Sequence, residues 1–172
     1  MRRVSVGCIL AAVALALLLA GLAHAQGIVV AAGWAPTTIS AEANSETATT
    51  GAMFNVAASV VPFVKIVGDL GYAQKNGGKL YTATGGLRFG IPTGGVPKVK
   101  PFVEGLVGVE YLTGGGESST PGLAYGFGAG VDVKPVPVVG LRLQVNYFRA
   151  KQFGLSFNQI RFGVGISLSP GV

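Results

Sequence analysis

The chain has 172 residues, of which 49% are hydrophobic and 12% are charged. Its only cysteine, Cys8, and its only histidine, His24, lie near the amino terminus, so the rest of the chain has no thiol nucleophile, disulfide or imidazole. This composition excludes His-dependent catalytic triads and zinc sites built from Cys or His, and we expect no enzymatic activity and no cofactor. Basic residues outnumber acidic ones by 13 to 7, but without a basic run of the kind that binds nucleic acid.

The first 25 residues have the features of a cleavable export signal. Two arginines near the start precede an uncharged apolar run at residues 4–22, and the sequence Ala-His-Ala follows at residues 23–25. These are the charged, apolar and cleavage regions of a helical signal peptide. A transmembrane anchor is the competing interpretation, but no stop-transfer cluster follows the run. We therefore predict a signal peptide at residues 1–25 and a single domain at residues 26–172.

Beyond this leader, apolar residues recur at every second position, and no second apolar run reaches about 18 residues. Strict alternation is the sequence signal of a β-strand with two different faces. It is clearest in LAYGFGAGVDV at residues 123–133, where one face is apolar and the other combines small residues with an aspartate. The same pattern predicts strands, in chain order, at residues 28–37, 51–60, 64–72, 80–91, 99–112, 123–133, 139–149 and 160–168.

The connections between these strands alternate in character. Three contain proline and are mostly short, at residues 61–63, 92–98 and 134–138. The others are longer or more polar, and rich in Ser, Thr, Asn and Gly, at residues 39–50, 73–79, 113–122 and 150–158. Connections of this kind join successive antiparallel strands. The sequence thus predicts an all-β fold, an eight-stranded antiparallel up-and-down barrel with short turns at one end and longer loops at the other.

The face that points outward distinguishes two classes of barrel. A soluble barrel encloses its apolar face around a ligand, whereas an outer-membrane barrel turns that face to lipid. One aromatic residue per strand can be placed on the apolar face near the end of the longer loops, as in a girdle at a lipid–water boundary. We therefore predict a transmembrane barrel whose outer aromatic girdle comprises Trp34, Phe54, Tyr72, Tyr81, Tyr111, Tyr125, Tyr147 and Phe162.

Nearly all charged residues of the strands fall on the opposite, inner face. Because an eight-stranded barrel is only wide enough for side chains to fill it, we predict a packed plug of ion pairs rather than catalytic carboxylates. A turn centred near residue 96 would place Arg88 opposite Glu104. A turn centred near residue 137 would likewise pair Asp132 with Arg142. The predicted lumen network comprises Lys65, Asp69, Arg88, Lys100, Glu104, Glu110, Asp132, Arg142 and Arg161.

Polar loops and basic residues mark the outer rim. Basic side chains at that level would meet the phosphates of lipopolysaccharide, and we predict such contacts for Lys75, Lys79, Arg149 and Lys151. Phe153 and Phe157 in the last loop are expected to pack their hairpin above the membrane. An adhesive patch is the alternative for these two aromatic residues.

Four segments carry a resemblance to a known family. They are KPFVEGLVGVEYL at residues 100–112, GLAYGFGAGVDVKP at 122–135, VGLRLQVNYFRAK at 139–151 and IRFGVGISL at 160–168. These segments resemble the small eight-stranded outer-membrane β-barrel family, the OmpA-type transmembrane domain or porin-family barrel. The resemblance implies a monomer in the outer membrane of a Gram-negative envelope, in contact with its lipids and lipopolysaccharide and inserted by the outer-membrane assembly machinery.

Three functions agree with this pattern. The first is an outer-membrane protein with a structural or surface-interaction role, a side-chain-filled lumen and little or no conductance. The second is a narrow pore for ions or small solutes, which would favour a lumen of one charge sign, whereas the inner face carries five basic and four acidic residues. The third is a soluble periplasmic barrel that binds an apolar ligand. We expect the first.

Overall fold

The computed structural model describes residues 27–41, 44–93, 98–113, 121–136, 138–152 and 155–169. These ranges contain no helix, and hence none that is long and apolar enough to cross a membrane. The predicted signal peptide, and Phe153 of the last loop, lie outside them. The strands are β1 (Ile28–Trp34), β2 (Thr37–Ala41), β3 (Asn44–Ala48), β4 (Thr50–Val61), β5 (Val64–Lys75), β6 (Gly78–Gly90), β7 (Val99–Thr113), β8 (Gly122–Val133), β9 (Val139–Gln152) and β10 (Leu155–Leu168).

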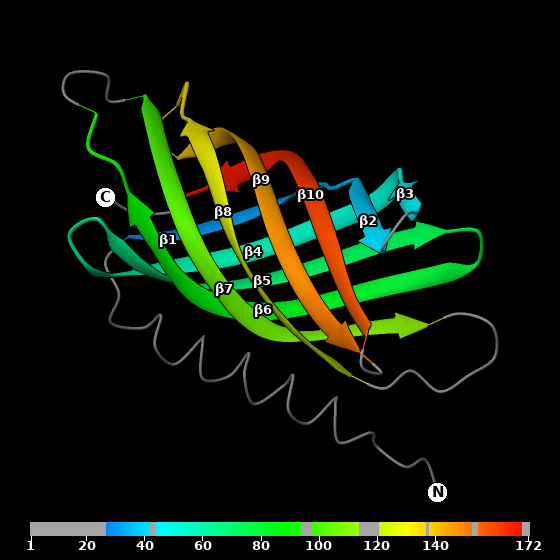
Figure 1. Ribbon diagram of the computed structural model, residues 1–172. Helices are drawn as coiled ribbons and strands as arrows, with labels where there is room; N and C mark the ends of the chain where they lie inside the picture. Colours follow the sequence, from blue (N-terminus) through cyan, green and yellow to red (C-terminus); the bar gives the residue numbers. More distant parts are fainter. Residues whose placement is uncertain are drawn as a thin grey trace, which may run out of the picture.

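These strands form one antiparallel sheet that closes on itself (Figure 1). Neighbours follow the order β1, β4, β5, β6, β7, β8, β9, β10, β2 and β3, and an additional pairing of β1 with β10 completes the circle. Both β1 and β2 pair with β10, so they are consecutive segments of one barrel strand. β3 leads in the same way into β4. The structure therefore confirms the predicted closed barrel of eight antiparallel strands.

The two ends of the barrel differ in their connections. We call the loop end the end that carries the connections β2–β3, β5–β6, β7–β8 and β9–β10. The turn end carries the start of β1, the end of β10 and the connections β4–β5, β6–β7 and β8–β9. Each barrel strand runs in the direction opposite to the one before it. With an even number of strands, the first strand therefore starts at the same end of the barrel at which the last strand finishes.

The first barrel strand is interrupted, although the sequence predicted a single strand at residues 28–37. Pro36 lies between β1 and β2 and has no N–H with which to continue the ladder. Its carbonyl oxygen still accepts a hydrogen bond from the N–H of Phe162 at 3.0 Å. The N–H of Ala35 donates to the carbonyl oxygen of Gly51, also at 3.0 Å. These two bonds carry the sheet across the break.

A further correction concerns residues 39–50, which the sequence predicted to be a loop. Much of this range belongs to the β2–β3 hairpin, which extends the barrel at the loop end. The hydroxyl oxygens of Thr38 and Thr47 lie 3.0 Å apart across the hairpin, and those of Ser40 and Ser45 lie 3.1 Å apart. Cross-strand hydroxyl pairs stabilise two strands without an apolar face. A strand pair of this composition lacks the hydrophobic alternation on which the prediction depended.

Two connections are two-residue turns. Asn76 and Gly77 join β5 to β6 with φ angles of 49° and 82°, and a type I′ turn requires positive φ at both positions. Residues 73–79 are consequently mostly strand and not the longer connection that was predicted. Pro62 and Phe63 join β4 to β5, and the φ of 68° at Phe63 has the sign that a type II turn requires after proline.

Alternate residues of the barrel strands point inward and outward. In β7, Glu104 and Leu106 are 3% and 4% exposed, whereas Val103 and Val107 are 43% and 57% exposed. Apolar side chains thus cover the exterior, and polar side chains fill much of the interior around a small buried cluster of Ala57, Val67, Leu106 and Phe148. This is the polarity of a barrel in lipid and the reverse of a soluble ligand carrier. The apolar exterior therefore contradicts the third candidate function, a soluble periplasmic barrel that binds an apolar ligand.

Candidate functional site in the barrel interior

Two arginine–carboxylate pairs link facing residues of neighbouring strands. Arg142 of β9 contacts both oxygens of Asp132 of β8, with Nε donating to Oδ1 at 2.7 Å and Nη2 to Oδ2 at 2.6 Å. Arg88 of β6 approaches one oxygen of Glu104 of β7, with Nε at 2.8 Å and Nη2 at 2.7 Å from Oε2. The strand registers place the partners directly opposite each other, in agreement with turns centred near residues 96 and 137.

A third pair crosses the lumen. Nη2 of Arg161 on β10 donates to Oδ1 of Asp69 on β5 at 2.5 Å, although the two residues are 92 positions apart in sequence. β5 and β10 are not neighbours in the sheet. Both side chains are buried. The pair therefore reaches across the interior of the barrel.

Three amide side chains join the first two pairs into one network. Asn146 donates from Nδ2 to Oε1 of Glu104 at 2.7 Å and accepts at Oδ1 from Nε2 of Gln144 at 2.9 Å. Oε1 of Gln144 accepts from Nδ2 of Asn55 at 3.3 Å. Oδ1 of Asn55 accepts in turn from Nη1 of Arg142. The hydrogen bonds thus run without a break from Glu104 to Arg142.

Two phenylalanine rings fill the space beside the arginines. Cζ of Arg88 lies 4.1 Å from the centroid of the Phe102 ring, and Cζ of Arg142 lies 5.1 Å from the same centroid. Cζ of Arg161 lies 5.0 Å from the centroid of Phe148. A guanidinium over an aromatic face is attracted by the ring quadrupole, and more strongly where water is excluded.

The sequence prediction did not include the neutral members of this site. Five of them lie on the inner faces of predicted strands, so alternation would have found them if neutral residues had been counted with charged ones; they are Asn55, Phe102, Gln144, Asn146 and Phe148. A sixth, Gln159, precedes the predicted start of the last strand. Because β10 begins at Leu155, Gln159 belongs to the barrel wall.

Glycines on the inner face leave room for the long side chains. A Cβ atom at Gly128 would overlap Nδ2 of Asn146, and one at Gly71 would overlap Nη1 of Arg161. A barrel of small radius can thus enclose arginine and amide side chains, because the space that each of them needs lies over a glycine.

Two predicted members of the network lie apart from it. Lys65 is half-buried near the turn end, where Nζ donates to the carbonyl oxygen of Gly27 at 3.3 Å. Lys100 is exposed, although it faces Asp132 in the β7–β8 register. A lysine close to a barrel end extends its flexible stem so that the ammonium group stays hydrated. Among the described residues, the interior ion pairs are those of the three arginines.

The remaining predicted carboxylate, Glu110, has an amide as its partner. It is 3% exposed, and its Oε2 accepts a hydrogen bond from Nε2 of Gln159 at 2.5 Å. In the part of the chain that the structure describes, Glu110 forms no ion pair. The described residues also contain no cluster of three or more acidic, Cys or His residues that could hold a metal ion.

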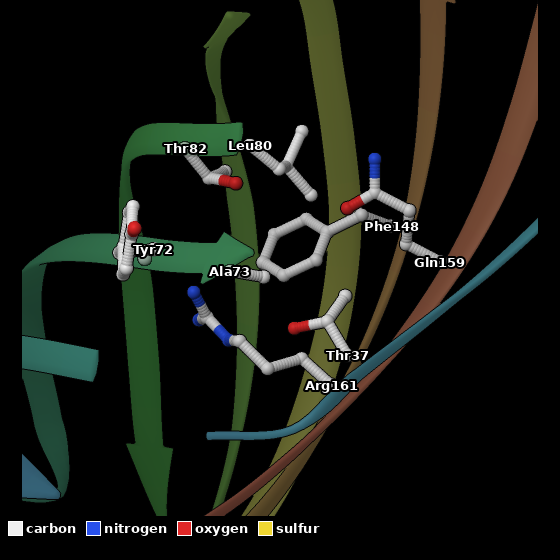
Figure 2. A pocket seen from close by; sticks show the side chains of 9 residues that line it. Thr37, Tyr72, Ala73, Leu80, Thr82, Phe148, Gln159 and Arg161 are labelled. Carbon is white, nitrogen blue, oxygen red and sulfur yellow. The ribbon is translucent and has the colours of Figure 1, made fainter. Parts of the chain in front are cut away.

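A small cavity of about 10 Å³ lies beside Arg161 (Figure 2). Figure 2 shows the ring of Phe148 at its centre, between Arg161 and Leu80. A volume of this size admits about one water molecule. Polar and aromatic side chains thus pack closely around this pair.

The predicted aromatic girdle lies on the exterior. All eight of its residues are exposed or half-buried. Tyr72, Tyr81 and Tyr111 face one another on three successive strands, and the rings of Tyr72 and Tyr81 are 5.2 Å apart. Nε1 of Trp34 donates to the carbonyl oxygen of Thr49 at 2.9 Å. The polar atom of this ring is thus satisfied towards the loop end, while its apolar body is exposed.

Aromatic residues on the exterior are not confined to that girdle. Phe127 is exposed, and its ring lies 5.4 Å from that of Tyr147. Phe63 and Phe89 are exposed near the turn end, where the sequence analysis predicted no aromatic girdle. Membrane barrels carry aromatic residues at both lipid–water boundaries. The apolar exterior is thus bordered by aromatic residues at its two ends.

The four predicted lipopolysaccharide contacts separate into two groups. Lys79, Arg149 and Lys151 are exposed and share the outward alternation of the girdle residues on their strands. Lys75 has the inward alternation of β5, and its Nζ lies 3.7 Å from Oε2 of Glu46. Lys75 therefore belongs to the mouth of the barrel and not to its lipid-facing wall.

Comparison with known proteins gives the fold a context. No family model and no curated protein matches the sequence. Among solved structures, Neisserial surface protein A (NspA) has a TM-score of 0.70 at 15% identity, over 82% of this chain and 96% of that one. Ail, the attachment invasion locus protein of Yersinia pestis, has a TM-score of 0.54 at 14% identity, over 83% and 99%. The N-terminal β-barrel domain of Pseudomonas aeruginosa OprF has a TM-score of 0.55 at 13% identity, over 84% and 100%.

These similarities concern the whole barrel. Each covers more than four fifths of this chain and almost all of the other. The closed sheet, the apolar exterior and the packed polar interior agree with them. The chain has the fold of the small eight-stranded outer-membrane β-barrels.

Proposed function

We propose that this protein is an integral outer-membrane barrel with a structural or surface-interaction role and little or no conductance. The main support for this proposal is the polarity of the barrel, which is the reverse of that of a soluble protein. Large apolar side chains cover the outside, and the arginine–carboxylate pairs lie inside. An ion crossing the lumen would have to displace side chains that are already paired. Closure of the sheet leaves the spanning strands without a free edge, which supports a monomer. We propose that the outer-membrane assembly machinery inserts it.

Single-channel recording tests the packed lumen. The wild-type protein in a planar bilayer is expected to give no resolved conductance steps. A double variant, Asp69→Ala with Arg161→Ala, removes the pair that crosses the lumen and is expected to give steps or a higher leak. Lys79→Ala, on the exterior, is the matched control and should behave as wild type. Steps of constant size from the wild-type protein would instead support a narrow pore.

We propose lipopolysaccharide as a lipid partner at the loop end. Lys79, Arg149 and Lys151 support this, because they are exposed on the outward side beyond the aromatic girdle, where phosphate groups would lie. Membrane fractionation followed by co-purified lipid analysis tests both location and partner. Recovery in the outer-membrane fraction, with less lipopolysaccharide bound to a variant that has all three residues changed to Gln, is the expected result. Recovery in the soluble fraction would contradict the proposal.

A further inference from the structure

A second and much larger cavity opens at the loop end. Its volume is about 610 Å³, within the range of small-molecule sites in proteins. It is formed where the β2–β3 hairpin rises beside the ends of β5, β6, β7 and β10. Its lining residues include Ile39, Glu46, Lys75, Leu80, Glu110, Leu112 and Phe157. We call this cavity the mouth cavity.

The base of the mouth cavity is apolar. Ala48, Ala73 and Leu80 form a buried cluster against which Ile39 packs. Leu112 lies opposite Leu80 on the adjacent strand, so it shares the inward face. It is nevertheless 43% exposed, because it faces the cavity. An inward-facing leucine beside water is a position that an apolar ligand would cover with a gain in free energy.

Glu110 gives this cavity a buried carboxyl group. Asp69, Glu104 and Asp132, the other carboxylates of the interior, each have an arginine partner. Among the described residues, Glu110 has the hydrogen bond from Gln159 and no cation. A buried carboxylate is stable as an ion when a positive charge compensates it.

The charges of the rim reinforce this asymmetry. Glu46 and Lys75 line the same cavity and offset each other, with Nζ and Oε2 3.7 Å apart. Among the described residues of the lining, the carboxyl group of Glu110 is then the acidic group without a cationic partner, and it would disfavour an anionic ligand. A cation would supply what the arginines supply elsewhere in the lumen.

We propose that the mouth cavity binds an amphipathic molecule that carries one cationic amine and an apolar body. The amine contacts the carboxylate of Glu110, which is buried in the wall of the cavity. The apolar body packs against Leu80, Leu112 and Phe157. This site goes beyond a structural role and does not require the lumen to conduct.

Three probes of equal skeleton and different charge test the ligand class. They are 4-phenylbutylamine, 4-phenylbutanol and 4-phenylbutyrate, titrated into the complete barrel in lipid nanodiscs while the methyl resonances of Ile39, Leu80 and Leu112 are followed by NMR. The amine is expected to bind at least about tenfold more tightly than the alcohol, and the carboxylate more weakly than both. Equal affinities for the three probes, or shifts elsewhere only, would overturn the proposal without any variant.

Substitutions of the two acidic residues locate the selectivity. Glu110→Gln is expected to remove the preference for the amine and to leave the affinity for the alcohol within about twofold. Glu46→Gln, at the paired rim position, is the matched control and should retain the preference. Glu110→Asp keeps the charge and should also retain it. An amine preference that persists in Glu110→Gln would contradict the assignment, whatever the conductance of the protein proves to be.

Discussion

A buried arginine in this barrel is stable because a carboxylate lies within reach. Arg88, Arg142 and Arg161 are almost fully buried, and each has an acidic partner within 2.5–2.8 Å. Desolvation of two ions consumes most of their Coulombic attraction. An intact pair is consequently expected to add little to the free energy of unfolding in comparison with a neutral pair. A buried charge left without its partner lowers that free energy strongly. The free energy of unfolding should reveal that asymmetry.

The Arg88–Glu104 pair provides the first stability prediction. Arg88→Met and Glu104→Gln should each lower the free energy of unfolding by about 3 to 5 kcal/mol, because each leaves one buried charge without its partner. The double variant should lose much less than either single one. Urea unfolding in lipid vesicles measures all three, with the exposed Lys79→Met as control. Single variants as stable as wild type would show that water reaches the pair.

At the scale of the strand, the inner face of β8 consists mostly of residues with small side chains or none. Gly126, Gly128 and Gly130 occupy its inward positions, and long side chains from β7 and β9 lie over them. The outward positions of the same strand carry Tyr125 and Phe127, which are exposed. The alternation therefore divides volume as well as polarity, with bulk directed to lipid and space given to the lumen network.

A pair of glycine substitutions tests this division of volume. At Gly128, a methyl group would overlap Nδ2 of Asn146 and crowd Oε1 of Glu104, so Gly128→Ala should cost about 1 to 3 kcal/mol. Gly105→Ala is the matched control, because a Cβ there meets nothing within 4 Å, and its effect should stay within about 0.5 kcal/mol. Urea unfolding of both variants gives the comparison. Equal effects would show that the interior adjusts freely.

At the scale of the whole molecule, closure determines what each end of the barrel can do. The chain enters and leaves at the turn end, so four connections remain at the loop end. The hairpins there extend beyond the girdle and enclose the mouth cavity. We expect the loop end to face outward from the cell, where the proposed surface role would take place.

Cysteine labelling tests this orientation. The only native cysteine, Cys8, belongs to the predicted leader, so a single introduced cysteine reports its own position. Asn76→Cys, in the β5–β6 turn, should react with a membrane-impermeant maleimide on whole cells. Lys98→Cys, exposed at the turn end, should react only after permeabilisation. The opposite labelling would show that the turn end faces outward.

Ser118 and Gly94 are expected from the sequence to lie in connections at opposite ends of the barrel, and both are outside the described residues.

Much of the fold could be read from local pattern. Alternation assigned inner and outer faces, and turn positions fixed Arg88 opposite Glu104 and Asp132 opposite Arg142. A hairpin turn determines the register of the two strands that it joins, so these pairs follow from the sequence alone. The same logic failed at the β2–β3 hairpin, where hydroxyl pairs replace apolar residues and leave no hydrophobic period to detect.

Contacts across the lumen were decided only by the tertiary structure. Arg161 meets Asp69 over 92 positions, and Arg142 meets Asn55 over 87. The sequence therefore suggested which charges share the interior but not which partner each one has, and it left Glu110 indistinguishable from the paired acids. Partners on opposite walls depend on how far the strands are staggered when β10 closes on β1, and that stagger is a property of the completed circle that no single hairpin contains.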